Sequence, residues 1–496
     1  MAERSTRREV LQALALGSAG LLAGRVTAFA HQAEPDAPRR AGELLIRGGR
    51  VVNADGSRVA DVRIAGERIT EIGQGLRPSP GERVIEAAGR LVLPGGIDPH
   101  THLSPPFADD LTTGSRAALA GGITSLGTFA FPGAKESLAA TLARAERGVT
   151  AAAIADVFLH AAAWPLTPEV IASLASIAGQ GQPSFKLFMP QDDYPAAADS
   201  VVALLEAARA AGIVTMVHCE DVTILGAAAR RLAAAGHTSL AYYAESRPVV
   251  AESAATHEIV ALCELTKAPV HVVHLSSARA LDACRAGRRL GIPLTVETRP
   301  LYLHLTAERM AGADAPLFVG QPPLRSAADR EALWAGLADG GIDILATDHA
   351  PWTRAQKLDP ALSVTKLRPG MSDLQFMLPM YFSEGVGKRS LPIERFVATT
   401  STNAARIFGL YPERGVVREG AIADVAVWDP SLARRVRAED DHSRSDYSVY
   451  EGWEVTGWPV VTIRRGDVVY EDGKVTGAPG SGRAIRRRPW KANAPE

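Results

Sequence analysis

The sequence predicts an α/β fold: a (β/α)8 barrel of the TIM type with a small β-sandwich domain built from both chain ends. Two observations support this prediction. Eight short apolar runs in the middle of the chain are each followed by an Ala- and Leu-rich stretch typical of a helix. Strand-like segments separated by Gly, Pro and Asn occur near both chain ends. A doubly wound open sheet is the alternative, because sequence periodicity does not show whether a sheet closes.

The composition describes a chain with enough apolar residues for a large core. Hydrophobic residues make up 46% of the 496 residues and charged residues 22%, which excludes a disordered chain. Lys and Arg number 54 against 55 Asp and Glu, and this balance argues against binding to nucleic acid or to an anionic membrane. Three cysteines without a CxxC pair exclude a disulfide scaffold and a structural zinc knuckle.

The first residues have the layout of a targeting signal. A basic start with Arg7 and Arg8 precedes a short apolar stretch over 10–24, so residues 1–30 are interpreted as a twin-arginine-type signal peptide and 31–41 as a linker. The apolar stretch is too short to span a bilayer, and no other segment is long and apolar enough to do so. We therefore expect export to the periplasm or the cell exterior, with a cytoplasmic location as the alternative.

The small domain is expected to combine residues 42–94 with residues 409–475. Its predicted strands lie at 44–46, 50–52, 61–64 and 83–85, and again at 424–428, 460–463 and 465–469. Residues 476–496 form a basic tail with Arg486, Arg487 and Arg488, which is expected to be solvated or to pack on a neighbouring subunit.

The barrel is expected to occupy residues 95–408. Its eight predicted strands are the apolar runs near 97–102, 123–129, 154–160, 184–189, 213–218, 270–275, 293–298 and 343–348. In such a barrel the chemistry is located at the carboxyl ends of the strands, so polar residues at the ends of these runs are the candidates for the active site.

Metal-ligating residue types stand at several of these ends. His100 and His102 are two residues apart on one strand, so both imidazoles point to the same side. A lysine, Lys186, lies within an apolar run, where it is costly unless it is paired or chemically altered. Imidazoles and a carboxylate that meet at one barrel mouth indicate a divalent metal site, and the candidate residues are His100, His102, His218, His274 and Asp348.

Other residues beside these positions are interpreted as structural. His271 lies three residues before His274 and is expected to face the opposite side of the strand. His349 is expected to turn away from the metals and to form a hydrogen bond, and Cys219 to pack in the core. His160 ends an apolar run and receives no role.

With these motifs the sequence resembles the amidohydrolase superfamily, and within it the cyclic amidases called hydantoinases or dihydropyrimidinases. The resemblance covers nearly the whole chain after the signal. The motifs, in one-letter code, are GGIDPHTHL at 95–103, SFKLFM at 184–189, SRP at 246–248, VHLSS at 273–277, PPLR at 322–325, ATDHAP at 346–351, NAARIFGL at 403–410, YEG at 450–452 and VTG at 455–457.

The resemblance implies an enzyme with two divalent metal ions, zinc being the expected metal. It implies that His100, His102 and Asp348 bind one ion and that His218 and His274 bind the other. Lys186, carboxylated by carbon dioxide or bicarbonate to N6-carboxylysine, is expected to bridge both. A hydroxide between the metals would attack the cyclic amide, with Asp348 as the general base. Such enzymes are commonly homodimers or homotetramers, and their substrate is a small cyclic amide or ureide.

The sequence departs from the hydantoinase pattern around the substrate. Gln191 stands where the family usually has a tyrosine, and Gln321 where it has a serine before PPLR; both are predicted substrate contacts. Pro369 replaces a substrate-contacting asparagine, Arg299 follows the Glu-Thr pair where a cysteine is usual, and Ser104 stands where many hydantoinases have Asp.

Hydantoins or dihydropyrimidines remain the leading substrate class, with allantoin or dihydroorotate as alternatives. Dihydroorotases normally carry an arginine at the position of Ser104, which argues against that activity. A non-catalytic scaffold protein is the alternative from another class, although such relatives typically lose metal ligands that this chain retains.

Overall fold

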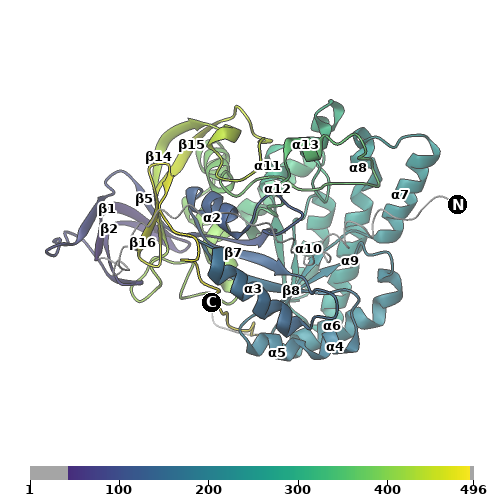
Figure 1. Ribbon diagram of the computed structural model, residues 1–496, viewed down its shortest axis with the longest axis horizontal. Helices are drawn as coiled ribbons and strands as arrows, with labels where there is room; N and C mark the ends of the chain where they lie inside the picture. The colour runs from purple at the N-terminus through teal and green to yellow at the C-terminus, as the bar shows by residue number, and fades with distance from the viewer. Residues whose placement is uncertain (1–42, 492–496) are drawn as a thin grey trace, which may run out of the picture.

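The computed structural model describes residues 43–491 (Figure 1). The predicted signal peptide at 1–30 and the linker at 31–41 lie outside the described residues. Among the helices that are described, none is long and apolar enough to cross a membrane. Figure 1 shows a sheet formed by the two chain ends beside a larger body of strands surrounded by helices.

The larger body is a parallel barrel, as predicted. Eight neighbouring strands follow the chain order, and each lies within or beside one of the apolar runs. The chain segment after the last strand approaches the first one, where Thr101 bridges His349 and the His102 amide donates to the His349 carbonyl at 2.8 Å. The strands are β6 Gly96–Thr101, β7 Ile123–Ala130, β8 Asp156–Ala162, β9 Ser184–Phe188, β10 Val214–His218, β11 Val270–Val272, β12 Leu294–Thr298 and β13 Ile344–Leu345.

Helices cover the outside of this barrel, and capping residues mark where several begin. Asp221 accepts from the Ile224 amide at 2.8 Å, and Ser326 forms a capping box with Asp329. Their bounds are α2 Leu111–Ala120, α3 Leu138–Ala152, α4 Pro168–Ala172, α5 Leu174–Gly179, α6 Ala198–Ala211, α7 Val222–Ala234, α8 Tyr243–Ser246, α9 Val249–Thr266, α10 Ala278–Arg289, α11 Pro300–His304, α12 Ala327–Asp339, α13 Arg354–Lys357, α14 Met377–Tyr381, α15 Ile393–Val397 and α16 Asn403–Ile407.

The second body is a nine-stranded mixed sheet made from both chain ends, which confirms that part of the predicted fold. The two ends join where β5 pairs antiparallel with β14, with Leu93 opposite Ala426. Buried Val and Ile side chains of both ends form a separate core under this sheet. Its strands are β1 Leu44–Asn53, β2 Gly56–Ala65, β3 Arg68–Gly73, β4 Arg83–Glu86, β5 Leu91–Pro94, β14 Val425–Arg435, β15 Glu454–Arg464, β16 Asp467–Glu471 and β17 Lys474–Val475.

The C-terminal tail crosses the amino-terminal end of its own barrel. The Val157 amide donates to the Arg483 carbonyl at 2.8 Å, and the Trp490 amide donates to the Gly212 carbonyl at 2.8 Å. Arg487 is 4% exposed and donates from Nη2 to Leu159 O at 2.6 Å and to Ser184 Oγ at 2.7 Å. The prediction that this arginine is solvated or packs on another subunit is therefore wrong. Its Nη2 donates to uncharged oxygen acceptors at the amino-terminal end of its own barrel.

Candidate metal centre

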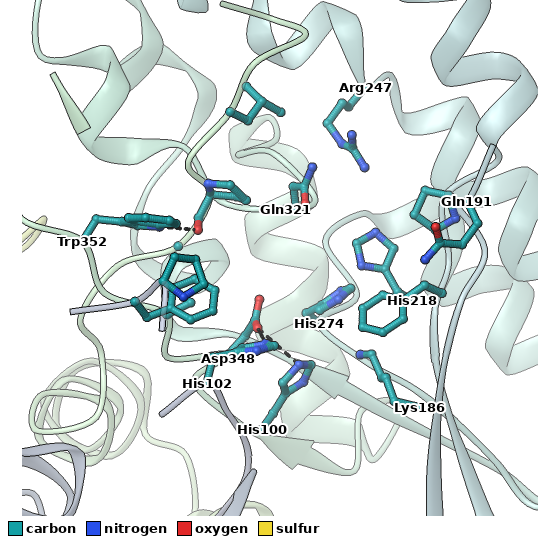
Figure 2. Close-up of a pocket in the computed structure, with 18 of the residues that line it drawn as sticks. His100, His102, Lys186, Gln191, His218, Arg247, His274, Gln321, Asp348 and Trp352 are labelled. Carbon is teal, nitrogen blue, oxygen red and sulfur yellow. Dashed lines mark hydrogen bonds and ion pairs between the residues drawn. The ribbon is translucent and has the colours of Figure 1, made fainter. Parts of the chain in front are cut away.

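A cavity of about 210 Å³ opens at the carboxyl ends of the barrel strands (Figure 2). All six predicted metal ligands line it, and Figure 2 shows their side chains converging on one space. They come from five different strands or strand ends, as the barrel rule requires. The remaining wall is largely apolar. Its residues are Pro106, Phe107, Phe131, Phe188, Pro190, Gln191, Arg247, Gln321, Ala350, Trp352, Val364, Thr365, Leu367, Pro369 and Gly370.

His100, His102 and Asp348 form the tightest group of potential ligands. The Nε2 atoms of the two histidines lie 3.2 and 3.1 Å from Oδ1 of Asp348. One ligand atom from each residue lies within 4.8 Å of the others, which suits a single metal ion. Asp348 follows β13 with a φ of +48°, a left-handed backbone that directs its carboxylate into the cavity.

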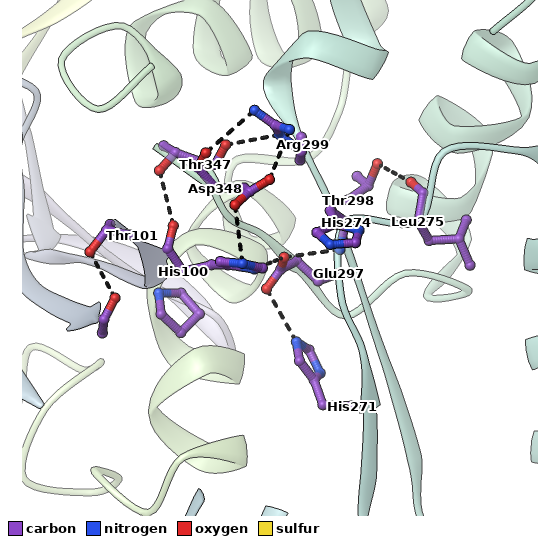
Figure 3. A network of polar contacts seen from close by, with 12 residues as sticks. His100, Thr101, His271, His274, Leu275, Glu297, Thr298, Arg299, Thr347 and Asp348 are labelled. Carbon is purple, nitrogen blue, oxygen red and sulfur yellow. Dashed lines mark hydrogen bonds and ion pairs between the residues drawn. The ribbon is translucent and has the colours of Figure 1, made fainter. Parts of the chain in front are cut away.

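Glu297, at the end of β12, orients this group from below (Figure 3). Its Oε1 lies 2.7 Å from Nδ1 of His100, so the opposite ring nitrogen, Nε2, is the one that faces Asp348. The same Oε1 accepts the backbone amide of His274 at 3.0 Å. A carboxylate behind a ligating imidazole fixes both the tautomer and the ring orientation. Sequence reasoning missed this residue, although a glutamate inside the apolar run 293–298 was a signal that could have found it.

His218 and His274 stand together on the other side of the cavity. Their ring centroids are 4.5 Å apart, and burial lowers the pKa of both imidazoles, which keeps them in the neutral form that binds cations. Nε2 of His218 lies 2.7 Å from Glu220, which also pairs with Arg247. This contact leaves Nδ1 of His218 for the cavity. Nδ1 of His274 has no hydrogen-bond partner among the described residues.

Lys186 lies between the two histidine groups on β9. Its side chain is 1% exposed, and Nζ has no hydrogen-bond partner in the part of the chain that the structure describes. Nζ lies 5.2 Å from the ring centroid of Phe129 and 5.3 Å from that of Phe188. Burial lowers the pKa of this amine to about 8. A neutral amine is the form that reacts with carbon dioxide, so an unpartnered Nζ beside four imidazoles fits the expected carboxylated lysine.

Comparisons with known proteins identify the family of this chain. The sequence model described as "Amidohydrolase family" matches residues 91–469. The chain belongs to the amidohydrolase family. The D-phenylhydantoinase of Escherichia coli strain K12 is 33% identical over 455 residues, which is 90% of this chain and 98% of that protein. The predicted resemblance is thereby confirmed.

Solved structures of related amidohydrolases share the fold. The dihydropyrimidinase of Brevibacillus agri NCHU1002 matches with a TM-score of 0.85 and 32% identity over 91% of this chain and all of that one. A D-hydantoinase from a Bacillus sp. AR9 matches with a TM-score of 0.86 and 34% identity over 90% and 100%. The L-hydantoinase of Arthrobacter aurescens matches with a TM-score of 0.82 at 26% identity, over 90% and 100%.

Two further histidines of this amidohydrolase, His349 and His271, lie next to the proposed metal ligands. His349 lies 2.8 Å from Asp109, which bears out its predicted hydrogen-bonding role. His271 was expected to face away from His274, and this is wrong: its Nε2 lies 3.3 Å from the Glu297 carboxylate inside the barrel, and the ring of His274 also faces the interior, beside His100. Strand β11 ends at Val272, and His274 adopts a φ of +39°, so the simple alternation of a strand does not extend to it. His271 does not line the cavity.

His160, which received no role, connects the floor of the barrel to the metal-binding strand. Its Nε2 lies 2.9 Å from the Pro99 carbonyl, which can only accept, so Nε2 carries the proton. Nδ1 must then accept from the Ser184 hydroxyl at 2.7 Å, and Ser184 Oγ accepts from Arg487. The tail is thereby linked to the strand of Lys186 and to the residue before His100. Cys219 is buried and free, as expected of a packing residue.

Two arginines near the site were not predicted as functional residues from the sequence. Arg247 lines the cavity, and Glu220 neutralises its charge through a buried ion pair. Arg299 is fully buried, and its Nη1 donates to Oδ2 of Asp348 at 2.9 Å. Gln191 and Gln321 both line the cavity, so both amides can reach a bound ligand.

Proposed function

We propose that this amidohydrolase hydrolyses a cyclic amide bond in a ring of the hydantoin or dihydropyrimidine type. One observation supports it above all: four imidazoles, one carboxylate and an unpartnered buried lysine amine face a single cavity at the barrel mouth. The residues would hold two divalent cations, zinc being the expected metal. His100, His102 and Asp348 would bind one ion, His218 and His274 the other, and carboxylated Lys186 would bridge them.

Bound cations would supply Lewis-acid polarisation of the ring carbonyl and would lower the pKa of a water molecule. The protein residues supply the proton transfer. As water adds to the ring carbonyl, the Asp348 carboxylate accepts one of its protons. As the carbon–nitrogen bond breaks, Asp348 returns that proton to the ring nitrogen. The product is a ring-opened acid that carries an amide or carbamoyl group at the former ring nitrogen.

The cavity wall supports a flat and mostly apolar ring substrate. Phe107, Phe131, Phe188 and Trp352 provide apolar surface, while Gln191 and Gln321 provide two amide groups that both donate and accept hydrogen bonds. We propose that the two glutamines bind the polar edge of the ring. Arg247 is paired through Nε and Nη2 with Glu220. This ion pair already compensates the positive charge that a substrate carboxylate, such as that of dihydroorotate, would need.

Two further parts of the proposal concern the whole protein. We propose that residues 1–30 direct export through a twin-arginine route, with a cytoplasmic location as the alternative. N-terminal sequencing of protein from the cell exterior or periplasm should begin near His31, whereas a retained Met1 in the cytoplasm would refute export. We also propose a homodimer or homotetramer, which sedimentation of the purified protein would test.

A hydrolysis panel tests the proposed reaction. Protein purified with zinc and bicarbonate should hold close to two metal ions per chain and should open hydantoin, 5-substituted hydantoins or dihydrouracil. Allantoin, dihydroorotate and cyclic imides complete the panel. Turnover of dihydroorotate alone would replace the proposed substrate class. Little bound metal and no hydrolysis of any compound would favour the scaffold alternative.

A further inference from the structure

Arg299 makes an unusual set of contacts around the proposed general base (Figure 3). It follows β12 and is completely buried. Besides the bond from Nη1 to Oδ2 of Asp348, its Nε donates to the Thr347 carbonyl at 3.0 Å, and Nη2 lies 3.5 Å from the Asp348 carbonyl. One guanidinium therefore contacts the side chain of Asp348 and the carbonyls on both sides of its Cα.

These contacts act on a residue whose backbone is strained. A left-handed conformation is uncommon at a residue other than glycine, and it persists where the surroundings enforce it. The φ of Asp348 is +48°, and the two carbonyls that Arg299 contacts belong to the peptides that flank this Cα. Arg299 is thus placed to hold the backbone turn that points the carboxylate into the cavity.

The two carboxylate oxygens of Asp348 contact different partners. Oδ1 faces the Nε2 atoms of His100 and His102, whereas Oδ2 faces Arg299. A carboxylate held at both oxygens cannot rotate about its terminal bond without losing one set. Each carboxylate oxygen has two acceptor positions, so Oδ2 can keep its bond to Arg299 and still receive a proton from water.

The guanidinium is itself fixed from its other side. Nη2 lies 3.6 Å from Oδ2 of buried Asp373, and the guanidinium carbon lies 5.6 Å from the ring centroid of Tyr302. Two carboxylates therefore flank one buried cation, so its charge is compensated without solvent. Arg299 is not among the residues that line the cavity, and a bound substrate would not touch it.

We propose that Arg299 is a positioning residue that locks the Asp348 carboxylate in its reactive orientation, with Oδ1 toward the metal side and Oδ2 toward the guanidinium. This inference rests on the proposed function for the role of Asp348 as the base. The cysteine that related hydantoinases usually carry here lacks the donors for these contacts. The amidohydrolase would therefore orient its base by a device that the sequence family does not generally use.

The test compares Arg299→Gln and Arg299→Lys with the wild type by three measurements: kcat and KM on a panel substrate, zinc affinity against a chelator, and melting temperature. We expect Arg299→Gln to lower kcat by about 10- to 100-fold, the usual effect of losing a residue behind a metal ligand, and to weaken zinc binding by about 10-fold. KM should stay within about 2-fold, because substrate does not reach Arg299. Arg299→Lys keeps the positive charge but lacks the planar guanidinium with its several donors, so it should recover only part of kcat.

Arg414→Gln is the matched control. Arg414 is also a buried arginine between two carboxylates, Asp156 and Asp424, but it lies away from the cavity. Arg414→Gln should have a lower melting temperature than the wild type, whereas its zinc affinity and the kcat of its folded form should stay unchanged. Equal losses of zinc affinity in Arg414→Gln and Arg299→Gln would mean general destabilisation and would overturn the proposal.

Three other outcomes are decisive. A folded Arg299→Gln with kcat and zinc affinity within 2-fold of the wild type overturns the positioning role, and so does a rise in KM at constant kcat. Full activity in Arg299→Lys overturns it as well, since charge alone would then suffice. If the wild type hydrolyses no compound of the panel, the proposed function fails, and the zinc affinities alone still decide whether Arg299 orients Asp348.

Discussion

Two lysines of this amidohydrolase are almost completely buried, but their amines differ in their hydrogen-bond partners. Lys357, at the end of α13, donates from Nζ to the carbonyls of Val319 at 2.9 Å, Arg368 at 2.8 Å and Gly370 at 3.0 Å. Nζ of Lys186 has no partner among the described residues. The ammonium of Lys357 is fully engaged by backbone oxygens, whereas that of Lys186 faces imidazoles and aromatic rings.

This difference shows how burial alone fails to identify a functional group. An unpartnered buried ammonium costs several kcal/mol, so a protein that keeps one has another use for the amine. Lys357 holds together the segment that forms one wall of the cavity, through Arg368 and Gly370. The unpartnered Nζ of Lys186 supports the proposal that this amine is carboxylated.

The largest effect should follow from Lys186→Ala. The variant removes the proposed bridge between the two ions, and we expect bound zinc to fall from close to two ions per chain to well below one, with activity reduced by at least about 1,000-fold. Elemental analysis of protein purified with zinc and bicarbonate measures the metal. Loss of activity with two ions still bound would contradict the bridging role.

Lys357→Met should have a smaller and different effect. It removes the Nζ donor from three carbonyls, of which only that of Val319 keeps another donor among the described residues, the Gly370 amide, so we expect the free energy of unfolding to fall by about 2–4 kcal/mol. Metal content should match the wild type, because Lys357 touches none of the proposed ligands. KM should rise, since Pro369 and Gly370 line the cavity and depend on this anchor. If Lys357→Met lost zinc, the two buried lysines would not differ in their effect on metal binding, which would contradict this prediction.

The sequence allowed the barrel and the proposed ligands to be predicted for one physical reason. Strands of a parallel sheet are covered on both faces, so they read as apolar runs, and a polar residue at the end of such a run stands out. His218 ends β10, and Asp348 follows β13 closely, as predicted. The joining of the two chain ends was predicted because both carry short strands with turn residues between them.

The supporting residues could not be predicted in the same way. Glu297 and Arg299 acquire their roles only because the end of β12 lies beside β13 and the ligands of β6, which is a property of the closed barrel. Arg487 belongs to a basic run that indicates a solvated tail, and only the floor of the barrel supplies its acceptors. His271 was misplaced because β11 ends before His274.

The two glutamines that line the cavity, unlike the two lysines, are proposed to contact the substrate directly. Each is expected to contribute one hydrogen bond to the ring, worth about 0.5–1.5 kcal/mol, so Gln191→Leu and Gln321→Leu should each lower kcat/KM by roughly 2- to 12-fold. Metal content should remain unchanged. Steady-state kinetics on the best panel substrate measures the loss. Unchanged kcat/KM in both variants would refute the proposed substrate contacts.

Another buried nitrogen without a hydrogen-bond partner among the described residues is Nε2 of His304. The rings of Trp334, Tyr450 and Trp453 surround this imidazole. Within the described residues, no hydrogen bond or ion pair joins it to a carboxylate. Burial lowers its pKa to about 3, with a further contribution from nearby arginines. We therefore interpret the His304 imidazole as a neutral ring held by packing. This interpretation predicts that the residue affects how stability depends on pH and does not affect metal binding.

The sign follows from proton uptake. The unfolded chain protonates His304 near pH 6.5 and the folded protein only near pH 3, so its contribution to stability is complete above pH 6.5 and is lost as the pH falls through that window. The loss amounts to about 1.4 kcal/mol per pH unit. Urea unfolding of His304→Phe should therefore show a flatter decline between pH 6 and about 4 than the wild type, with zinc content unchanged. Identical pH slopes for the two proteins would mean that the buried ring is protonated in the fold, and a loss of zinc would make His304 part of the metal centre after all.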